Sequence, residues 1–444
     1  MRTRSWPRGV IALLAAVSMI LAACGGDDAA DEPDAPADDA AADDAAADDD
    51  AAADDDAADD DAAAEDAAAS DFSGTLTVWH NYDEGVPGLN NAMSVWASMF
   101  EDMYPDVTVQ TELSDYDGFA QRLLAATVAG ESFDVAIIAA FNLPELYQAG
   151  AVDAIDDLWA AYPDADLFPA DVIDVLRAED GAQFGTQAFG NIPGLYVNLD
   201  LLDELGLDIP TSEEEFEAAL AAASDAGYVG VTGVGMAGGA GEFNMLPWAI
   251  SKGWSFNDPT NEAMREMLVQ QERWVAEGWR SANDSTGFVA TDNFLAGDHL
   301  FAQDGNWQLS NYLDNAPFEW TLITIPELFD GGALGGEAIA IGAESQREMA
   351  WAFVTEVLLS EEGQQVAAEA LSVPLRQGVD LSSADESLGP FAELVGGSLA
   401  IPLSANSASI STLLGDNYSE VIAGAKDADA AADAIFAELP GLLE

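Results

Sequence analysis

The sequence predicts an α/β fold in which the strands of parallel sheets alternate with helices. Three strand-like apolar runs, at residues 75–79, 107–111 and 134–139, open the part of the chain that has core-forming side chains. A helix-length segment separates each run from the next, which is the pattern of βαβ units. The 373 residues after position 71 exceed what one hydrophobic core usually organises, so we expect two lobes. No period of about 20 to 50 residues recurs, which argues against a solenoid.

A segment with helical periodicity follows the first strand. Trp96 and Phe100 fall on one face of this segment, together with Val95, Met99 and Met103. We expect that face to pack against the sheet. The tryptophans that lie on helical apolar faces, and that we expect in the core, are Trp96, Trp274 and Trp351.

The clearest local pattern begins at residue 194. Residues 194–198 alternate as a strand does, and Gly206 is a C-cap residue for the helix that follows. Thr211 or Ser212 can cap the next helix. The acidic first turn of that helix, residues 213–215, suits the positive end of the helix dipole.

The start of the chain has the features of a secretory signal. Basic residues at positions 2, 4 and 8 precede an apolar run at 10–21, which is too short to cross a bilayer. Residues 21–24 resemble a bacterial lipobox, whose cysteine receives a diacylglyceryl group that anchors it stably. We therefore expect residues 1–23 to be a lipoprotein signal peptide, the alternative being a plain secretory signal. Cys24 is the only cysteine of the chain, so no disulfide framework and no thiolate metal site is expected.

An acidic, low-complexity stretch follows the cysteine. Residues 27–71 are almost only Ala and Asp, and they hold 21 acidic residues and no basic one. Closely spaced like charges repel, and nothing in this stretch is large enough to form a core. We expect residues 24–71 to form a lipidated, disordered tether that holds a globular domain at the outer face of the cytoplasmic membrane.

The part of the chain after residue 71 is also strongly acidic. It holds 61 of the 82 acidic residues and 9 of the 12 basic ones, and Lys252 and Lys426 are the only lysines of the chain. Such a surface disfavours nucleic acid and anionic lipid as partners. The acidic side chains of this part of the chain repel one another, and salt screens that repulsion. We therefore expect a host in saline or alkaline water and a stability that rises with added KCl.

Six segments, taken in chain order, resemble a known family. The strongest runs from residue 184 through Leu195-Tyr196-Val197-Asn198-Leu199-Asp200-Leu201-Leu202 to residue 216. Asp304-Gly305-Asn306-Trp307 resembles the family's Asn-Gly-Pro-Trp turn, with Gln308 where proline is common. The other segments are residues 76–80 with 99–107, 134–152 with 156–158, 335–341 with 350–354, and 373–376. The family is that of the extracellular solute-binding lipoproteins of ABC importers, in the branch that includes maltose-type sugar binders.

The resemblance implies a two-lobe, periplasmic-binding-protein-like fold with hinge segments and a ligand cleft between the lobes. Lobe one would take residues 72–186 and 334–371, and lobe two residues 187–333 and 372–444. The lobes would close on the ligand, and the closed form would be recognised by the transmembrane permease subunits. The expected protein is a monomeric, lipid-anchored binding protein with no cofactor, no metal and no catalytic residues.

The expected ligand is a sugar or oligosaccharide, which needs flat aromatic rings for its faces and planar polar groups for its hydroxyls. Ligands bind beyond the carboxyl ends of parallel strands, which directs attention to residues 80–83 and 141–142. The polar candidates are His80, Asn81, Tyr82, Asp83, Asn142, Asn191, Asn306, Glu337 and Arg376. The aromatic candidates are Trp307, which the family's turn places at the cleft, and Trp248 and Trp254. His80 is expected to be a hydrogen-bonding group, and His299 to be exposed.

Three rival interpretations stay open. A secreted lipoprotein enzyme acting on carbohydrates could use paired carboxylates, although the sequence has no Gly-x-Ser-x-Gly, phosphate-loop or His-Glu-x-x-His motif. A surface adhesin would need no hinged, two-lobe design. A binding protein for a polyamine, a peptide or an organic anion would keep the fold and change the ligand. Residues 233–241 are rich in glycine and are expected to form a flexible loop.

Overall fold

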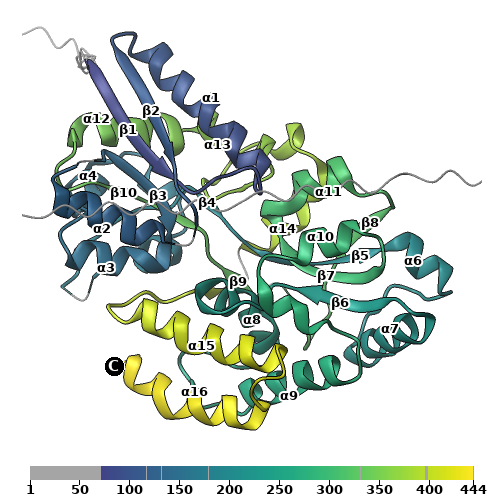
Figure 1. Ribbon diagram of the computed structural model, residues 1–444. Coiled ribbons are helices and arrows are strands. Elements are labelled where there is room, and N and C mark those ends of the chain that lie inside the picture. Colours follow the sequence, from purple (N-terminus) through teal and green to yellow (C-terminus); the bar gives the residue numbers. More distant parts are fainter. Residues whose placement is uncertain are drawn as a thin grey trace, which may run out of the picture. The chain divides into compact units, whose positions relative to one another are not determined.

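The computed structural model describes residues 72–443, except residues 117, 132, 179, 331 and 396–398 and the side chains of 399 and 400 (Figure 1). These residues belong to one compact unit, Ala68–Glu444. The predicted signal peptide, Cys24 and the tether of residues 24–71 lie outside the described residues. In the described part of the chain, no helix combines the length and the apolar character needed to cross a membrane.

The first lobe is built on a four-stranded sheet with the strand order β10-β3-β1-β2. The strands are β1 Gly74–His80, β2 Val107–Leu113, β3 Val135–Ala139 and β10 Glu337–Ile341. The first three are parallel to one another, and they confirm the three strands and the βαβ connections predicted from the sequence. The fourth strand, β10, returns from far along the chain and runs antiparallel to β3.

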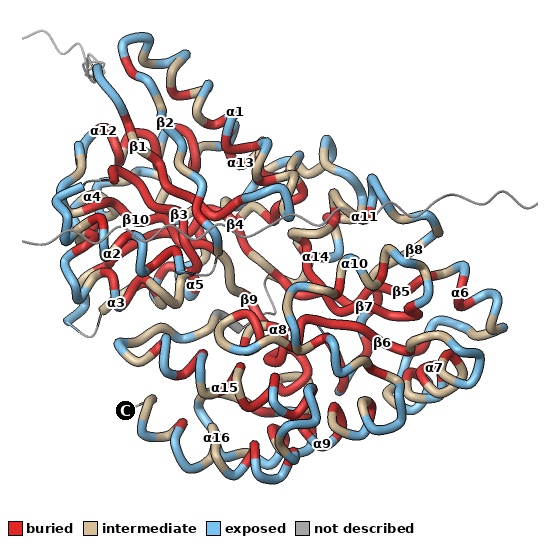
Figure 2. Tube along the Cα trace, in the orientation of Figure 1, coloured by how far each residue is buried: buried red, intermediate tan, exposed pale blue. Residues whose placement is uncertain are grey.

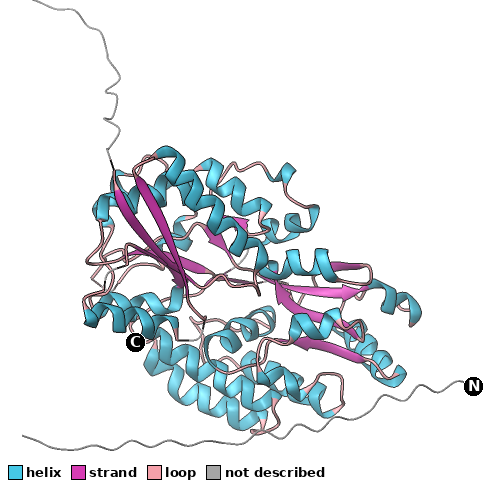
Figure 3. Ribbon diagram, turned by 45° about the horizontal axis from the view of Figure 1, so that its top comes forward, coloured by secondary structure: helices cyan, strands magenta, loops and turns pink. Residues whose placement is uncertain are grey.

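Helices flank both faces of this sheet (Figure 3). The connections between its strands are long enough for a helix, as parallel pairing requires. The helices of this lobe are α1 Pro87–Met103, α2 Phe119–Ala129, η1 Ala140–Asn142, α3 Leu143–Gln148, α4 Asp156–Ala161, η2 Ala165–Leu167, α5 Ala170–Asp174, α12 Arg347–Ala352, the π-helical η5 Phe353–Leu358 and α13 Glu361–Glu369.

The second lobe has its own four-stranded sheet, with the order β6-β7-β5-β8. Its strands are β5 Pro193–Asn198, β6 Val229–Gly233, β7 His299–Gly305 and β8 Trp320–Ile323. Strands β6 and β7 are parallel, whereas β5 runs antiparallel to both β7 and β8. The sheet is therefore mixed. The first sheet is mixed as well through β10, while the three strands read from the sequence, β1 to β3, are parallel as predicted.

Two helices of the second lobe, α6 Leu199–Glu204 and α7 Glu213–Ala226, follow the pattern read from the sequence. Ser212 is the N-cap of α7, and its hydroxyl accepts a hydrogen bond from Glu215 N at 3.2 Å. Gly206 has a positive φ at the end of the helix after β5, as expected for a C-cap. The helices are α6 Leu199–Glu204, α7 Glu213–Ala226, α8 Gly238–Ser251, α9 Ala263–Ala276, η3 Ala282–Thr286, α10 Ala290–Leu295, η4 Asn306–Gln308, α11 Leu309–Asn315, α15 Ser407–Ile422 and α16 Ala428–Leu442.

Short paired segments connect the two lobes. Strand β4 Phe189–Gly190 pairs with β11 Val373–Pro374, and β9 Ala333–Leu334 pairs with β12 Leu399–Ala400. The segment after β11 also contains η6 Leu381–Ser383, η7 Glu386–Leu388 and α14 Gly389–Leu394. All strands of each large sheet fall inside the residue ranges predicted for its lobe, while the lobe boundaries themselves stay a prediction.

The core lies along the strands and on the inner faces of the helices (Figure 2). Trp96 and Trp274 are completely buried, as predicted. Trp351 is only half-buried, although its ring packs against the core of the first lobe. The expectation for His299 is wrong: it is buried at the start of β7, with its Nδ1 2.8 Å from Oδ1 of Asp298.

The expectation of a flexible loop at residues 233–241 is also wrong. Gly233 ends β6, and Gly238 begins α8. This start is held against α15, because Gly238 N donates to Oδ1 of Asp416 at 3.1 Å. Gly415 permits the contact, since a Cβ at that position would lie 1.9 Å from the carbonyl oxygen of Gly238. Packing of the two helices thus overrides the low helix propensity of glycine.

Candidate functional site

A pocket lies between the end of the first sheet, helix α8 and the segments that connect the lobes. It encloses about 660 Å³ of space free of protein atoms, part of it open to solvent. Its walls come from the ends of β3 and β10, from α5, from the connecting segments and from α8.

The carboxyl end of β3 forms the wall in the first lobe. Ala139 ends this strand, and Glu337, the first residue of the antiparallel β10, stands in register with it. Phe141 follows in η1 and also lines the pocket. The pocket therefore lies where the topology of a parallel sheet places a ligand, beyond the carboxyl ends of its strands.

Three of the predicted polar residues surround the carboxylate of a fourth, Glu337. Glu337 is 6% exposed, and its Oε2 accepts a hydrogen bond from Asn191 Nδ2 at 3.1 Å. Burial raises the pKa of Glu337. Hydrogen bonds to the Asn81 and Asn191 amides lower it in part, and the nearby Tyr82 hydroxyl acts in the same direction as these bonds. Asn81 and Tyr82 follow β1, which lies next to β3 in the sheet.

Several polar atoms of this group lack a hydrogen-bond partner. These are Oδ1 of Asn81, Oη of Tyr82 and Oδ1 of Asn191, all of them buried. Burial raises the pKa of Tyr82, and the nearby charge of Glu337 raises it further. The Oη of Tyr82 nevertheless does not meet hydrogen-bond geometry with Glu337. Buried polar atoms nearly always have partners, so unpaired ones beside a pocket indicate where a polar ligand binds.

The connecting segments form the floor of the pocket. Gln187 is buried, and its Nε2 donates to the carbonyl oxygens of Phe189 at 3.0 Å and Gly335 at 2.9 Å. Gly336 adopts a φ of +134°, and a Cβ there would lie 2.8 Å from Gln187 Nε2. Glycine is therefore required for this segment to pass over Gln187 and deliver Glu337 to the pocket.

Helix α8 forms the wall in the second lobe. Glu242 and Phe243, both in its first half, line the pocket. Glu242 is 4% exposed, and its Oε2 accepts a hydrogen bond from the Ser411 hydroxyl. Burial raises the pKa of Glu242 to about 7, although the bond from Ser411 lowers it. Each lobe thus contributes one buried carboxylate and at least one aromatic ring to the same pocket.

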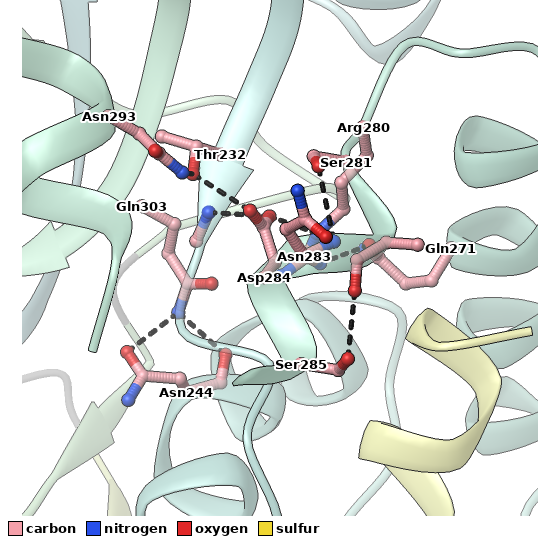
Figure 4. A network of polar contacts seen from close by, with 12 residues as sticks. Thr232, Asn244, Gln271, Arg280, Ser281, Asn283, Asp284, Ser285, Asn293 and Gln303 are labelled. Carbon is pink, nitrogen blue, oxygen red and sulfur yellow. Dashed lines mark hydrogen bonds and ion pairs between the residues drawn. The ribbon is translucent and has the colours of Figure 1, made fainter. Parts of the chain in front are cut away.

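A buried glutamine holds α8 in place. Gln303, on β7, donates through Nε2 to the carbonyl oxygen of Asn244 at 2.6 Å and to its Oδ1 at 3.2 Å (Figure 4). The Oε1 of Gln303 accepts a hydrogen bond from Trp248 Nε1 at 2.9 Å. Trp248, a predicted ligand contact, is buried in the core of the second lobe and does not line the pocket. Trp248 supports the position of α8 through its hydrogen bond to Gln303, and it is not a proposed ligand contact.

The predicted turn at residues 306–307 lies next to the pocket. Trp307 packs on Phe243 with 5.9 Å between ring centroids, so it backs a residue that lines the pocket. Asn306 is buried, and its Oδ1 accepts a hydrogen bond from Ile192 N at 2.8 Å, which ties the turn to the segment between the lobes. Its Nδ2 has no partner.

The remaining predicted residues do not line the pocket. His80 is buried, and burial lowers its pKa to about 4, so it is neutral and its Nδ1 accepts from Tyr82 N at 3.2 Å. Trp254 is buried in the second lobe. Arg376 pairs with Asp164, with 2.8 Å between Nη2 and Oδ2. The two others are the half-buried Asn142 and the exposed Asp83, whose Oδ1 accepts from Gly85 N at 2.8 Å.

Sequence reasoning missed several residues of the pocket. The expectation of a loop at residues 233–241 left unpredicted the helix α8, which carries Glu242 and Phe243. Met245, Trp248 and Ala249 have the spacing of a buried helical face, and this signal could have predicted the helix that carries both. The others are Tyr116, beyond the end of β2, Gln187 in the first connecting segment, and the apolar Val172, Val175, Ile401 and Leu403.

A second polar network lies behind this wall (Figure 4). Arg280 and Asp284 form a buried ion pair, with Nε donating to Oδ2 at 2.8 Å. Arg280 Nη1 also donates to Gln271 Oε1 at 2.6 Å and to Tyr418 Oη at 2.7 Å. Gly233 N donates to the Asp284 carboxylate, so the network fixes the end of β6, from which the chain leads into α8.

Solved structures with the same architecture span nearly the whole of this part of the chain. The GacH receptor of Streptomyces glaucescens, solved unliganded and with acarbose, is 19% identical, with a TM-score of 0.74 over 84% of this chain and 99% of that one. A solute-binding protein of an ABC transporter from Thermotoga lettingae, bound with α-D-tagatose, is 16% identical, with a TM-score of 0.73 over 84% and 100%. Maltose-bound MalE3 of T. maritima is 20% identical, with a TM-score of 0.70 over 83% and 99%.

These likenesses confirm the predicted two-lobe fold. No curated protein matches the chain closely enough to count as a relative. Residues 95–387 match the family described as bacterial extracellular solute-binding protein, and this match covers well over half of the chain. The chain therefore belongs to the family of bacterial extracellular solute-binding proteins.

Proposed function

We propose that this protein captures a sugar or an oligosaccharide in the pocket between its lobes and delivers it to an ABC transporter permease. The observation that carries the proposal is the pairing, in one pocket, of aromatic rings and buried planar polar groups from both lobes. Phe141 and Phe243 supply apolar faces for a sugar ring. Gln187, Asn191 and Glu337 supply amide and carboxylate groups for its hydroxyls.

Capture requires the two lobes to close on the ligand. A ligand that contacts the end of β3 in one lobe and α8 in the other binds best when both lobes surround it. Binding therefore shifts the population toward the closed form. The short segments that connect the lobes are the hinge in this proposal. The closed form then docks, as a monomer, on the permease, while diacylated Cys24 and the acidic tether keep the protein at the outer face of the membrane.

The test is a thermal-shift screen of the purified protein in high salt, against neutral mono- and oligosaccharides, amino acids, peptides and organic anions. A ligand present at 100 times its dissociation constant stabilises a protein by about 2.7 kcal/mol, which shifts the melting temperature measurably. We expect a saturable shift with a saccharide. The Phe243→Ala variant is expected to weaken its binding at least about tenfold, because a stacking face of about 1.4 kcal/mol or more is lost.

Phe256→Ala is the matched control. Phe256 is half-buried in the same lobe, against Trp254, and does not line the pocket. Its removal is expected to leave saccharide affinity unchanged. Recovery of the sugar unaltered after incubation supports a binding protein, whereas its consumption would establish the enzyme alternative. A shift with non-sugar solutes alone would keep the fold and overturn the ligand class.

A further inference from the structure

The charges that line the pocket are all of one sign. Among the described residues that form its walls, Glu242 and Glu337 are the ionisable carboxylates, and none is Lys, Arg or His. Both carboxylates are almost completely buried. A buried carboxylate without a cationic partner is costly to ionise, so a cationic ligand would stabilise the ionised forms of Glu242 and Glu337.

Among the described residues that line the pocket, the buried polar atom without a partner is an acceptor, and it calls for a donor. Asn191 donates its Nδ2 to Glu337, which leaves its unpaired Oδ1 as an acceptor. Asn81, which hydrogen-bonds to Glu337 but does not line the pocket, also has an unpaired Oδ1. Oδ1 of Asn191 and the carboxylate of Glu337 thus form a set of acceptors on one side of the pocket. A protonated amine carries three N–H donors and no acceptor, so it matches such a set better than a hydroxyl, which both donates and accepts.

Positive groups near the pocket are already paired elsewhere. The N-terminus of α8, where Gly239 lines the pocket, carries the positive end of a helix dipole. Its first amide, Gly238 N, donates to the Asp416 carboxylate. Arg280, which lies behind the α8 wall, is held by Asp284. The charge of Arg280 is therefore already balanced by Asp284, and Asp416 partly offsets the N-terminus of α8.

We propose that the solute captured in this pocket carries a protonated amine, which binds against the carboxylates of Glu337 and Glu242 while its ring packs on the aromatic walls. This inference rests on the proposed function and narrows its ligand class to amino-substituted saccharides. A polyamine presents the same ammonium chemistry without the ring. The excess of acidic residues over the chain would also steer a cation toward the protein.

The test is isothermal titration calorimetry of the purified protein near neutral pH. It compares saccharides that differ only in the substituent at the amino position, together with one polyamine. The probes are β-1,4-linked glucosamine oligomers, the same oligomers N-acetylated and therefore neutral, the corresponding glucose oligomers, and spermidine. We expect the glucosamine oligomers to bind at least about tenfold more tightly than both neutral series. Glu337→Gln and Glu242→Gln are each expected to weaken this binding by roughly ten- to hundredfold, the value of a hydrogen bond to a charged group, and to change neutral-sugar affinity much less.

Glu344→Gln is the matched control, since Glu344 is exposed and follows the opposite end of the strand that begins at Glu337. It is expected to leave all affinities unchanged, and the melting temperatures of the three variants show that each is folded. Equal or tighter binding of the neutral sugars would overturn the amine and leave the proposed function standing. Binding of spermidine without any saccharide would support the amine and overturn the sugar. No binding by any probe would overturn both.

Discussion

Replacing Arg280 by methionine is expected to lower the free energy of unfolding by about 3–5 kcal/mol, the usual cost of removing one partner from a buried ion pair. The Asp284 carboxylate would remain in the core with Gly233 N and the Thr232 hydroxyl as donors but without a positive charge. Gln271 and Tyr418 would each lose a hydrogen bond as well. Urea denaturation measures the loss, because urea is uncharged and leaves the screening of this acidic protein unchanged.

Arg265 offers a matched control on the surface. Its guanidinium pairs with Glu262, Asp429 and Asp433, all of them largely exposed, so Arg265→Met is expected to cost about 1 kcal/mol or less. The double variant Arg280→Met with Asp284→Leu removes both charges and should be more stable than Arg280→Met alone. Equal costs at positions 280 and 265, or additive losses in the double variant, would contradict a buried pair that acts as a unit.

The fold could be predicted well where the signals are local. Strands β1 to β3 combine apolar runs with helix-length spacing, and the Ser212 cap and the Gly206 turn depend on residues within one helical turn. The antiparallel strand β10 could not be predicted in this way, because its place beside β3 is set by a chain return from about 200 residues further on. Pairing over such a distance leaves no periodic mark on either strand.

The candidate site could be predicted only in part, for two different reasons. Asn81 and Tyr82 follow the end of a strand, and the rule for strand ends predicted them. Glu337 was predicted instead from the glycine-rich segment at residues 335–341 that resembles the family. Trp248 could not be separated from a ligand contact by sequence, since an aromatic residue suits a core and a sugar equally well. Glu242 lies at the glycine-rich start of α8, which the approach of α15 at Gly415 stabilises. The sequence marks only the later part of this helix, through the spacing of Met245, Trp248 and Ala249.

Replacing Trp96 by alanine is expected to lower the free energy of unfolding by about 3–5 kcal/mol, as for other large aromatic residues in cores. Trp96 is 0% exposed, and its Nε1 donates to the carbonyl oxygen of Gly363 at 3.0 Å. Its ring stacks on Phe189, with centroids 5.4 Å apart and planes within 1° of parallel. Because Phe189 belongs to β4, between the two lobes, the cavity would open next to the proposed hinge. Urea denaturation of the variant measures the loss.

The neighbouring residue on α1 provides the control. Val95 is 46% exposed, so Val95→Ala is expected to change stability by no more than about 0.5 kcal/mol. Trp96→Phe keeps most of the stacked ring but removes the Nε1–H donor, and it should cost less than the alanine variant, by an amount that reports the packing. Similar losses in the phenylalanine and alanine variants would mean that the hydrogen bond to Gly363 of α13, rather than the stack on Phe189 of β4, accounts for most of the stabilisation by Trp96.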